Sequence, residues 1–403
     1  MEKALIYLPY SYFIDSYEHK ALGAIPIGFK EAGFDTSLIV GAMKSVKFRE
    51  TGIRIYETGN RDDRYIINGK PFAMHMIPRL MNALNLGEYK KALNIIKGEK
   101  PNIVLAYNNS TLTWLIFWRY KLYCKFNKIK TTMVLKLDND GTDLIGMKGV
   151  RKLALELYYK LLSHIFDGII TETSCGYRVF SGLPGVKPKL KIVPNTVFND
   201  FLENNGTTGR DKTIISVSRI TPVKGIDLLI KSFKLLADRY PDWNLEIIGP
   251  ITNEKYYSHL VDMVNSSGLE KRVIFTGEKN RKELMEIYKH ASVYCLFSEF
   301  ESFAISRLEA VSMGLYVVTS DAGCASDFVK YGVHVMMENT PECGSRYIED
   351  GIKAIESGAF SGNHIKIPSY WEISMQRGTG DMPPSMWMPC TGCSRRRNLV
   401  TML

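Results

Sequence analysis

Two glutamates, Glu301 and Glu309, lie eight residues apart where an apolar strand is followed by a short polar turn and a helix. The amide N–H groups at the start of a helix have no partners within it, and the positive end of the helix dipole lies behind them. Such a helix start readily binds a phosphate or pyrophosphate group. We expect this role for four consecutive amides, those of Ser302, Phe303, Ala304 and Ile305.

The spacing of the two carboxylates suits a nucleoside diphosphate linked to a sugar. If most of the interval is helical, the rise between Glu301 and Glu309 is about 12 Å, close to the length of a nucleoside diphosphate. One carboxylate could then meet the sugar and the other the ribose hydroxyls, because carboxylates accept hydrogen bonds from hydroxyl groups. The alternative is structural: Glu309 faces solvent and Glu301 caps the helix.

Two cations, Arg219 and Lys224, lie in the loop that follows the first strand of the second half of the chain. Together they could hold a diphosphate leaving group. The alternative is a pair of solvated loop charges. Gly249 follows another strand and would let a ligand approach the backbone closely, or it simply makes a turn.

These side chains lie in a sequence that alternates short apolar runs with helical stretches, which predicts mostly parallel α/β sheets. In the front half the predicted strands are Ala4–Leu8, Thr36–Val40, Ile103–Tyr107, Thr132–Leu137, Gly168–Thr171 and Leu190–Val193, and the predicted helices are Lys20–Ala32 and Lys152–Ser163. In the back half the predicted strands are Thr213–Val217, Asn244–Ile248, Val273–Thr276, Val293–Leu296 and Tyr316–Thr319. The predicted helices there are Ile226–Arg239, Tyr256–Ser266, Arg281–His290 and Phe303–Met313.

A polar stretch, Asn199–Lys212, separates the two series and reads as a linker. We therefore predict an acceptor-side domain over residues 1–195, a donor domain over 196–367 and a tail over 368–403. Two Rossmann-like halves of this kind form a cleft between them, which is the usual place for a ligand. From about Gln376 onward the tail has no clean helical or strand period, so we expect poor order there.

Composition limits the remaining classes of protein. The chain has 403 residues and a net charge of +10, which favours anionic partners without choosing among phosphate groups, acidic membranes and nucleic acid. Seven irregularly spaced cysteines predict reduced thiols and a cytoplasmic location. The amino terminus reads as a buried strand instead of a signal peptide, and no apolar run is long enough to span a bilayer.

The second half resembles family 4 glycosyltransferases, which have the GT-B fold and a Glu-x7-Glu signature. The matching runs are Ser-Val-Ser-Arg-Ile with Lys-Gly, Leu-Glu-Ile-Ile-Gly, Val-Ile-Phe-Thr-Gly-Glu, Glu-Ser-Phe-Ala with Glu-Ala, and Val-Val-Thr-Ser-Asp-Ala-Gly. They follow one another in order from about Lys191 to Val335. Gly249 and Gly277 belong to the second and third runs, so the resemblance adds both to the expected donor site.

The resemblance implies an α/β protein of the GT-B class, with two Rossmann-like domains facing each other across a cleft. It implies that Arg219 and Lys224 bind the donor phosphates, that Glu309 binds the ribose and that Glu301 contacts the transferred hexose. It also implies retention of the anomeric configuration, with no cofactor and no required metal. The expected partners are a nucleotide-sugar donor and a glycan or lipid-linked acceptor, and not nucleic acid.

The acceptor side of the front half is marked by three residues, Asp138, Asp140 and Asn195. Asp138-Asn139-Asp140 has the form of an Asp-x-Asp metal site, but two acids flanking one residue often arise by chance. We expect an acceptor-facing loop there and no metal site.

The segment Trp114–Lys130 interleaves aromatic and basic residues. A helix of this type can lie in the interface of a membrane, for example the cytoplasmic face of the inner membrane. The alternative is an ordinary core helix with a solvated basic edge, and the sequence leaves both open.

Two other functions remain open. A nucleotide-sugar epimerase shares the two-domain fold. A catalytically inactive nucleotide-sugar-binding subunit is suggested by the unusual tail and by the absence of the glycine pair that the family has after its first strand.

Overall fold

The computed structural model describes residues 1–8, 12–13, 21–59, 66–67, 70–71, 86–107, 111–138, 141, 144–145, 147–195, 197, 201, 209–360 and 362. The chain divides into two compact units. We call them unit 1, which contains Met1–Asn195, and unit 2, which contains Thr196–Met375. The predicted tail, residues 368–403, and Asp140 lie outside the described residues. The cleft predicted between the two halves stays a prediction, since each unit is described by itself.

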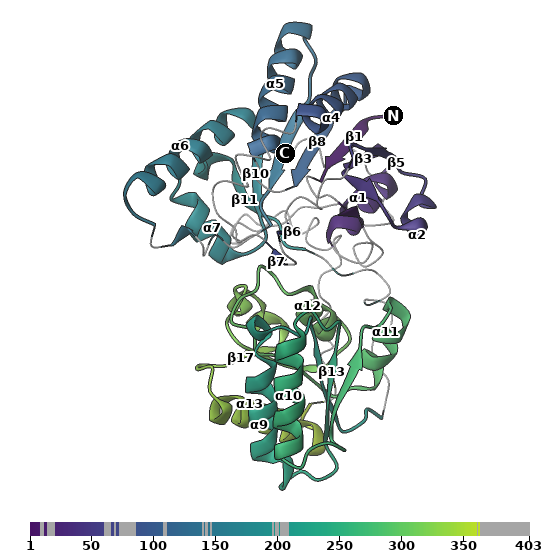
Figure 1. Cartoon of the computed structure of the whole chain (residues 1–403), viewed down its shortest axis with the longest axis vertical. Helices are drawn as coiled ribbons and strands as arrows, with labels where there is room; N and C mark the ends of the chain where they lie inside the picture. The colour runs from purple at the N-terminus through teal and green to yellow at the C-terminus, as the bar shows by residue number, and fades with distance from the viewer. Residues whose placement is uncertain are drawn as a thin grey trace. The chain divides into compact units, whose positions relative to one another are not determined.

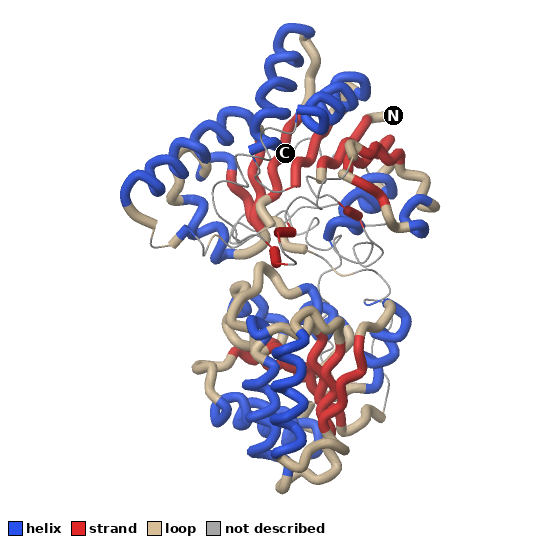
Figure 2. The backbone as a smooth tube through the Cα atoms, viewed as in Figure 1, coloured by secondary structure: helices blue, strands red, loops and turns tan. Residues whose placement is uncertain are grey.

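Unit 1 is built on a seven-stranded sheet with the order β11-β10-β9-β8-β1-β3-β5, in which every pair of neighbours is parallel (Figures 1 and 2). Its strands are β1 (Lys3–Tyr7), β3 (Asp35–Val40), β5 (Arg54–Glu57), β8 (Ile103–Tyr107), β9 (Thr132–Lys136), β10 (Gly168–Thr171) and β11 (Leu190–Ile192). Its helices are α1 (Ala21–Glu31), α2 (Val46–Arg49), α4 (Leu86–Glu99), α5 (Thr111–Asn127), α6 (Gly149–Ile165), α7 (Ser174–Ser181) and the 3-10 turn η4 (Lys187–Lys189). Two small ladders pair β2 (Tyr12–Phe13) with β4 (Ala42–Met43) and β6 (Ile66–Ile67) with β7 (Lys70–Pro71).

Unit 2 is built on a six-stranded parallel sheet with the order β14-β13-β12-β15-β16-β17. Its strands are β12 (Thr213–Val217), β13 (Asn244–Ile248), β14 (Val273–Gly277), β15 (Val293–Leu296), β16 (Tyr316–Thr319) and β17 (Val333–Val335). Its helices are α9 (Ile226–Ala237), α10 (Glu254–Ser266), α11 (Arg281–His290), α12 (Ile305–Ser312) and α13 (Pro341–Glu356), with the 3-10 turns η5 (Pro222–Lys224) and η6 (Ala325–Tyr331).

The strands of unit 2 are apolar on both faces because helices cover both. Alternate residues of one strand enter different cores: Ile214 packs with α9, α10 and α13, whereas its neighbour Ile215 packs with α11 and α12. Side chains of successive strand residues point to opposite faces, so a strand covered on both sides reads as a continuous apolar run. This is why these strands were recognisable in the sequence.

The predicted strands Ile103–Tyr107, Gly168–Thr171, Thr213–Val217, Asn244–Ile248, Val293–Leu296 and Tyr316–Thr319 are confirmed with the same bounds. The predicted helix Phe303–Met313 is shorter than expected: it begins at Ile305, because Ala304 before it adopts a left-handed conformation with φ of 62°. The prediction of a helix over Trp114–Lys130 corresponds to α5, whose Phe117 and Tyr120 are buried in the core of unit 1. The core-helix alternative therefore describes much of α5.

Cys124, Cys295 and Cys343 are buried free thiols. Cys175 and Cys324 are disulfide-bonded, so the prediction of reduced thiols is wrong for these two residues. None of the described helices has the length and apolar character needed to cross a bilayer.

Candidate functional site

Three loops meet at the carboxyl edge of the sheet in unit 2. They follow β12, β15 and β16, and β12 lies directly beside β15 in the middle of the sheet. After β12 the chain adds β13 and β14 on one side of the sheet, and then β15, β16 and β17 on the other side. The position between β12 and β15 is therefore the topological switch point of the sheet. In open parallel sheets ligands bind in the crevice at such a point.

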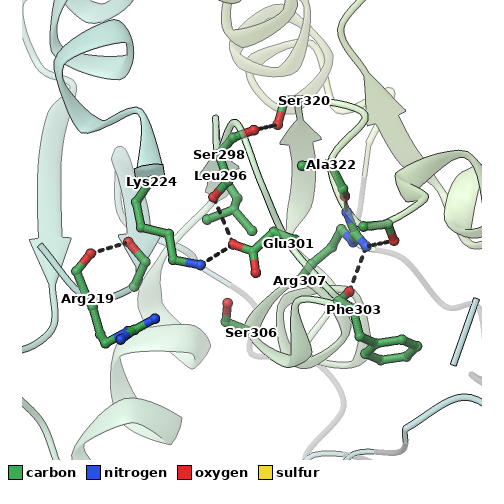
Figure 3. A network of polar contacts seen from close by, with 12 residues as sticks. Arg219, Lys224, Leu296, Ser298, Glu301, Phe303, Ser306, Arg307, Ser320 and Ala322 are labelled. Carbon is green, nitrogen blue, oxygen red and sulfur yellow. Dashed lines mark hydrogen bonds and ion pairs between the residues drawn. The ribbon is translucent and has the colours of Figure 1, made fainter. Parts of the chain in front are cut away.

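Lys224 and Glu301 meet across this edge (Figure 3). The Lys224 Nζ atom lies 2.5 Å from Glu301 Oε1, and the Ser298 hydroxyl donates to the same oxygen at 2.8 Å. The Lys224 and Glu301 side chains are 12% and 11% exposed, so solvent screens their attraction little. Both donors contact Oε1. Within the described part of the chain no residue donates a hydrogen bond to the second carboxylate oxygen, Oε2, so this oxygen is available to a ligand.

Glycine at position 225 makes the contact between the two loops possible. Gly225 has φ of 62°, and a Cβ atom there would lie 2.1 Å from the carbonyl oxygen of Phe297. The Glu299 amide also donates to the Val223 carbonyl oxygen at 2.9 Å. The close backbone contact sets Lys224 directly opposite Glu301.

A second glycine holds Glu301 from the other side. Gly323 lies in the loop after β16, has φ of 61°, and a Cβ atom there would lie 2.8 Å from the Glu301 Cβ. The Ser320 hydroxyl in the same loop donates to the Ser298 carbonyl oxygen at 2.5 Å. Glu301 is therefore positioned by all three loops.

The four predicted amides, those of Ser302 to Ile305, make no hydrogen bond to another described residue. They precede and open α12, as expected for an anion site. Because α12 begins at Ile305, the interval from Glu301 to Glu309 is only partly helical, and the predicted helical rise over the whole interval does not apply.

Arg307 stabilises the turn that precedes α12, and this role was not predicted from the sequence. Its buried guanidinium donates to the Phe303 carbonyl oxygen at 2.7 Å and to the Ala322 carbonyl oxygen at 3.0 Å. Burial lowers its pKa to about 10, so it stays charged at neutral pH. The sequence did contain a signal for this role: Arg307 is a charged residue next to Leu308, on the apolar side of a short helix.

Glu309 lies on α12 and is tied to α11. The buried Tyr288 hydroxyl contacts Glu309 Oε2 and the Ser306 carbonyl oxygen, each at 3.2 Å. Burial, and next the charge of Glu309, raise the pKa of Tyr288 well above its usual value, so this hydroxyl keeps its proton. Glu309 is partly buried and therefore does not behave as a plain solvated glutamate.

Arg219 lies after β12 and is exposed. Figure 3 shows Arg219 on the same side of Glu301 as Lys224, and of these two cations Lys224 makes the contact with Glu301. Gly249, with φ of 145°, allows a close approach of protein backbone: a Cβ atom there would lie 2.0 Å from the Ser218 carbonyl oxygen. Gly277 has φ of 72° and open space where a Cβ would be.

Unit 1 has a polar cluster of its own at the carboxyl ends of β9, β10 and β11. Buried Lys136 forms an ion pair with buried Glu172, and the Asn195 amide donates to Glu172 Oε1 at 2.7 Å. Lys136 also lies over the Tyr107 ring, 5.3 Å from its centroid. Of the predicted acceptor-side residues, the structure therefore brings Asn195 and Asp138 into one cluster with charges that were not predicted.

Asp138 is the unusual acid of this cluster. Burial and, next, the charge of Glu172 raise the pKa of Asp138 to about 8. Glu172 Oε2 is buried without a donor among the described residues, and a proton on Asp138 could satisfy it. Lys136 and Glu172 each lie at the end of an apolar strand, a position that the sequence shows, but their pairing follows from the neighbouring strands β9 and β10. In the described part of the chain no group of three or more His, Cys, Asp or Glu gathers as a metal site.

The chain is similar to known glycosyltransferases in sequence over its second half and in fold over most of its length. The family model described as glycosyl transferases group 1 matches residues 198–354, which cover unit 2 from before β12 into α13. An uncharacterized glycosyltransferase of Haemophilus influenzae is 31% identical over 163 residues, which are 40% of this chain and 43% of that protein. The lipopolysaccharide core biosynthesis mannosyltransferase LpsB of Rhizobium meliloti is 29% identical over 143 residues, 35% of this chain and 38% of that protein.

The matches to these two relatives each span less than half of either protein. Among solved structures, Anabaena Alr3699/HepE in complex with UDP and glucose is similar over 90% of this chain and 92% of that chain, with a TM-score of 0.65 and 16% identity. This likeness shows the fold: two α/β units with parallel sheets, as in GT-B glycosyltransferases.

Proposed function

We propose that the chain is a retaining glycosyltransferase that moves a hexose-type sugar from a nucleotide diphosphate sugar to a glycan or lipid-linked acceptor. The observation that carries the proposal is the Lys224–Glu301 pair at the switch point of unit 2, directly before the amides that open α12. This arrangement suits a sugar diphosphate. The ammonium and the row of amide donors match the phosphates, and the free carboxylate oxygen matches a sugar hydroxyl. The family match over residues 198–354 supports this assignment.

In this proposal each predicted residue has a distinct role. Lys224 and Arg219 bind the diphosphate, together with the amides of Ser302 to Ile305. Glu301 accepts hydrogen bonds from sugar hydroxyls, and Glu309 accepts them from the ribose. Gly277 leaves room beside the nucleotide, since no atom lies within 4 Å of the position of its Cβ. Gly249 acts indirectly, because it lets the Ser218–Arg219 backbone pass close by.

The chemistry requires stabilisation of a leaving diphosphate. The bond between the anomeric carbon and the diphosphate oxygen breaks, and the acceptor hydroxyl forms a new bond to that carbon on the same face. Its proton passes to the departing diphosphate. Fixed positive charges aimed at the developing charge lower such a barrier. Two cations and a helix start supply them here, so the proposal includes no metal and no cofactor.

The acceptor would bind at unit 1. The cluster of Lys136, Asp138, Glu172 and Asn195 lies at the carboxyl edge of its sheet, where open parallel sheets bind ligands. The proton of Asp138 is directed to Glu172, whereas Asn195 Oδ1 is buried without a donor among the described residues. A hydroxyl group of a glycan would match this amide oxygen. Asp140 remains a sequence-based candidate.

We further propose that the protein works in the cytoplasm and contacts the membrane surface, where a lipid-linked acceptor would be within reach. The relative from Rhizobium meliloti is named for lipopolysaccharide core biosynthesis, which is consistent with a glycan acceptor.

Two other activities would give different products. An epimerase would convert a nucleotide sugar into its isomer without an acceptor and without releasing nucleoside diphosphate. An inactive binding subunit would bind the donor and release nothing. Product analysis by chromatography therefore separates all three.

The experiment that tests donor binding is a thermal-shift screen against nucleotides and nucleotide sugars, with and without EDTA. A ligand that binds the folded state raises stability by about 2.7 kcal/mol at one hundred times its dissociation constant. We expect a shift with one nucleoside diphosphate that survives EDTA and is lost in Glu309→Ala. No shift with any nucleotide, or a shift that Glu309→Ala retains, would contradict the donor site.

A further inference from the structure

Helix α6 of unit 1 carries an apolar surface that the fold leaves uncovered. Val150, Leu153, Leu157 and Leu161 are 83%, 67%, 57% and 41% exposed. Their spacings of three, four and four residues place them on one side of the helix. We call this the outer face of α6. Ile145 and Met147, just before the helix, are exposed as well.

The outer face is not needed to hold α6 in place. The opposite side of the helix inserts Tyr159, Leu162 and Ile165 into the core of unit 1. In Figure 1, α6 forms part of the outline of the unit. Single exposed apolar residues are normal on protein surfaces, but a contiguous row of this kind marks an interaction site.

The charges around this face indicate what covers it. Lys148, Arg151, Lys152 and Lys160 are exposed on or beside α6. The helix has one acidic residue, Glu156, which pairs with Lys152 at 3.8 Å. An apolar stripe bordered by lysine and arginine is typical of helices that lie in the interface of a bilayer with anionic lipids.

Other occupants fit this charge pattern less well. A second copy of the chain would bring a second basic border against the first. The tail contains Arg395-Arg396-Arg397 and the whole chain has a net charge of +10, so a segment from the tail would also meet like charge. The surface of an anionic bilayer supplies the opposite charge and an apolar layer together.

We propose that the outer face of α6, with Ile145 and Met147, docks on an anionic lipid surface and lies parallel to it. A membrane contact is part of the proposed function, on which this inference rests for its biological use. The binding surface itself is new: it lies on α6 and not on α5, the helix that the sequence indicated. Aliphatic side chains would enter the acyl boundary while the lysine and arginine side chains meet the headgroups.

The test is flotation of the full-length protein with vesicles of phosphatidylcholine alone or with phosphatidylglycerol added. We expect binding to the anionic vesicles that falls with salt, and weak binding to the neutral ones. In Leu153→Gln with Leu157→Gln, the partition coefficient should fall about tenfold or more, because two buried apolar side chains are lost. The matched control is Leu235→Gln with Ile274→Gln, two exposed apolar residues of unit 2, which should bind like the wild type.

Circular dichroism and thermal melting check that each variant folds. Arg151→Gln with Lys160→Gln provides a second variant, in which only surface residues are changed. Equal binding by the wild type and the Leu153/Leu157 variant, or no binding to anionic vesicles, would overturn the inference. So would light scattering that shows a dimer lost in that variant while vesicle binding is unchanged. Nucleotide binding, measured in parallel, should be unaffected, so failure of docking and failure of the donor site are distinguishable.

Discussion

Lys224 and Glu301 are 77 positions apart in the chain, and yet the lysine ammonium lies 2.5 Å from a carboxylate oxygen of the glutamate. This pair joins the loops after β12 and β15, the two strands at the switch point of the second sheet. One oxygen of Glu301 is occupied by Lys224 and Ser298, so the other can accept from a ligand hydroxyl. In the proposed function, the pair therefore connects the ammonium that would bind phosphate with the carboxylate that would contact the sugar.

Glu301→Gln should reduce turnover much more than nucleotide binding. We expect kcat to fall about 10²- to 10³-fold, because a group that acts at the reacting sugar is changed. The dissociation constant for the nucleoside diphosphate should change less than about threefold, since that ligand carries no sugar. Steady-state kinetics and calorimetry measure the two effects. Glu299→Gln, an exposed neighbour in the same loop, is the control. Equal losses in both variants would remove Glu301 from the site.

Glu309→Gln should act on the nucleotide end. The amide oxygen can still accept from Tyr288, so the packing between α11 and α12 should be kept. Loss of the charged acceptor should raise the dissociation constant for a nucleoside diphosphate about tenfold, while inhibition by inorganic pyrophosphate stays unchanged. Calorimetry checks the first effect and inhibition kinetics the second. Glu286→Gln, on the exposed side of α11, serves as control. Weaker inhibition by pyrophosphate in Glu309→Gln would argue against a ribose contact.

Gly225→Ala should destabilise the protein far more than Gly268→Ala. The two glycines have nearly the same φ, 62° and 64°, but only Gly225 has an atom within 4 Å of its missing Cβ, namely the Phe297 carbonyl oxygen and its neighbours. The left-handed conformation alone costs an alanine about 1–2 kcal/mol, and the clash at position 225 should raise the loss above about 3 kcal/mol. Urea unfolding measures both. Similar losses would mean that the loop contact is not tight.

Asp138 should make stability depend on pH. Its pKa is raised to about 8 in the folded chain, against about 3.9 for an ordinary unfolded aspartate. The stability contributed by its proton is fully present below the unfolded pKa and is lost as the pH rises through about 8. Asp138→Asn should therefore show a smaller fall in stability than the wild type between about pH 5 and about pH 9.

Urea midpoints across this range provide the measurement for Asp138. Asp262→Asn, an exposed position on α10, is the matched control and should follow the wild type. Parallel curves for the wild type and Asp138→Asn would show that Asp138 titrates as an ordinary carboxyl.

The order of strands and helices could be predicted because each buried strand is a short apolar run with recognisable ends. The start of α12 could not, since Phe303, Ala304 and Ile305 continue an apolar pattern and nothing in it signals the left-handed Ala304. The loops that carry Arg219, Lys224 and Glu301 were correctly placed after strands. Their contact depends on strand order, which the sequence does not state.

The buried ion pair of unit 1 was harder to predict. Lys136 and Glu172 are 36 positions apart, and each alone looks like a charge at the end of a strand. Only the pairing of β9 with β10 brings them together, so the buried ion pair became visible with the fold. Similarly, leucines on α6 indicate apolar packing, but which of them reach the core is decided by neighbouring elements.

The central claim is most directly tested by following the release of nucleoside diphosphate from the nucleotide sugar that gives the thermal shift, with the wild type and with Arg219→Ala plus Lys224→Ala. We predict steady release by the wild type, in the presence of EDTA, and loss of at least about 10²-fold in the double variant. Chromatography should show the sugar as a transferred or free species and not as an isomeric nucleotide sugar. Equal release by both proteins, or no release by the wild type, would contradict the account.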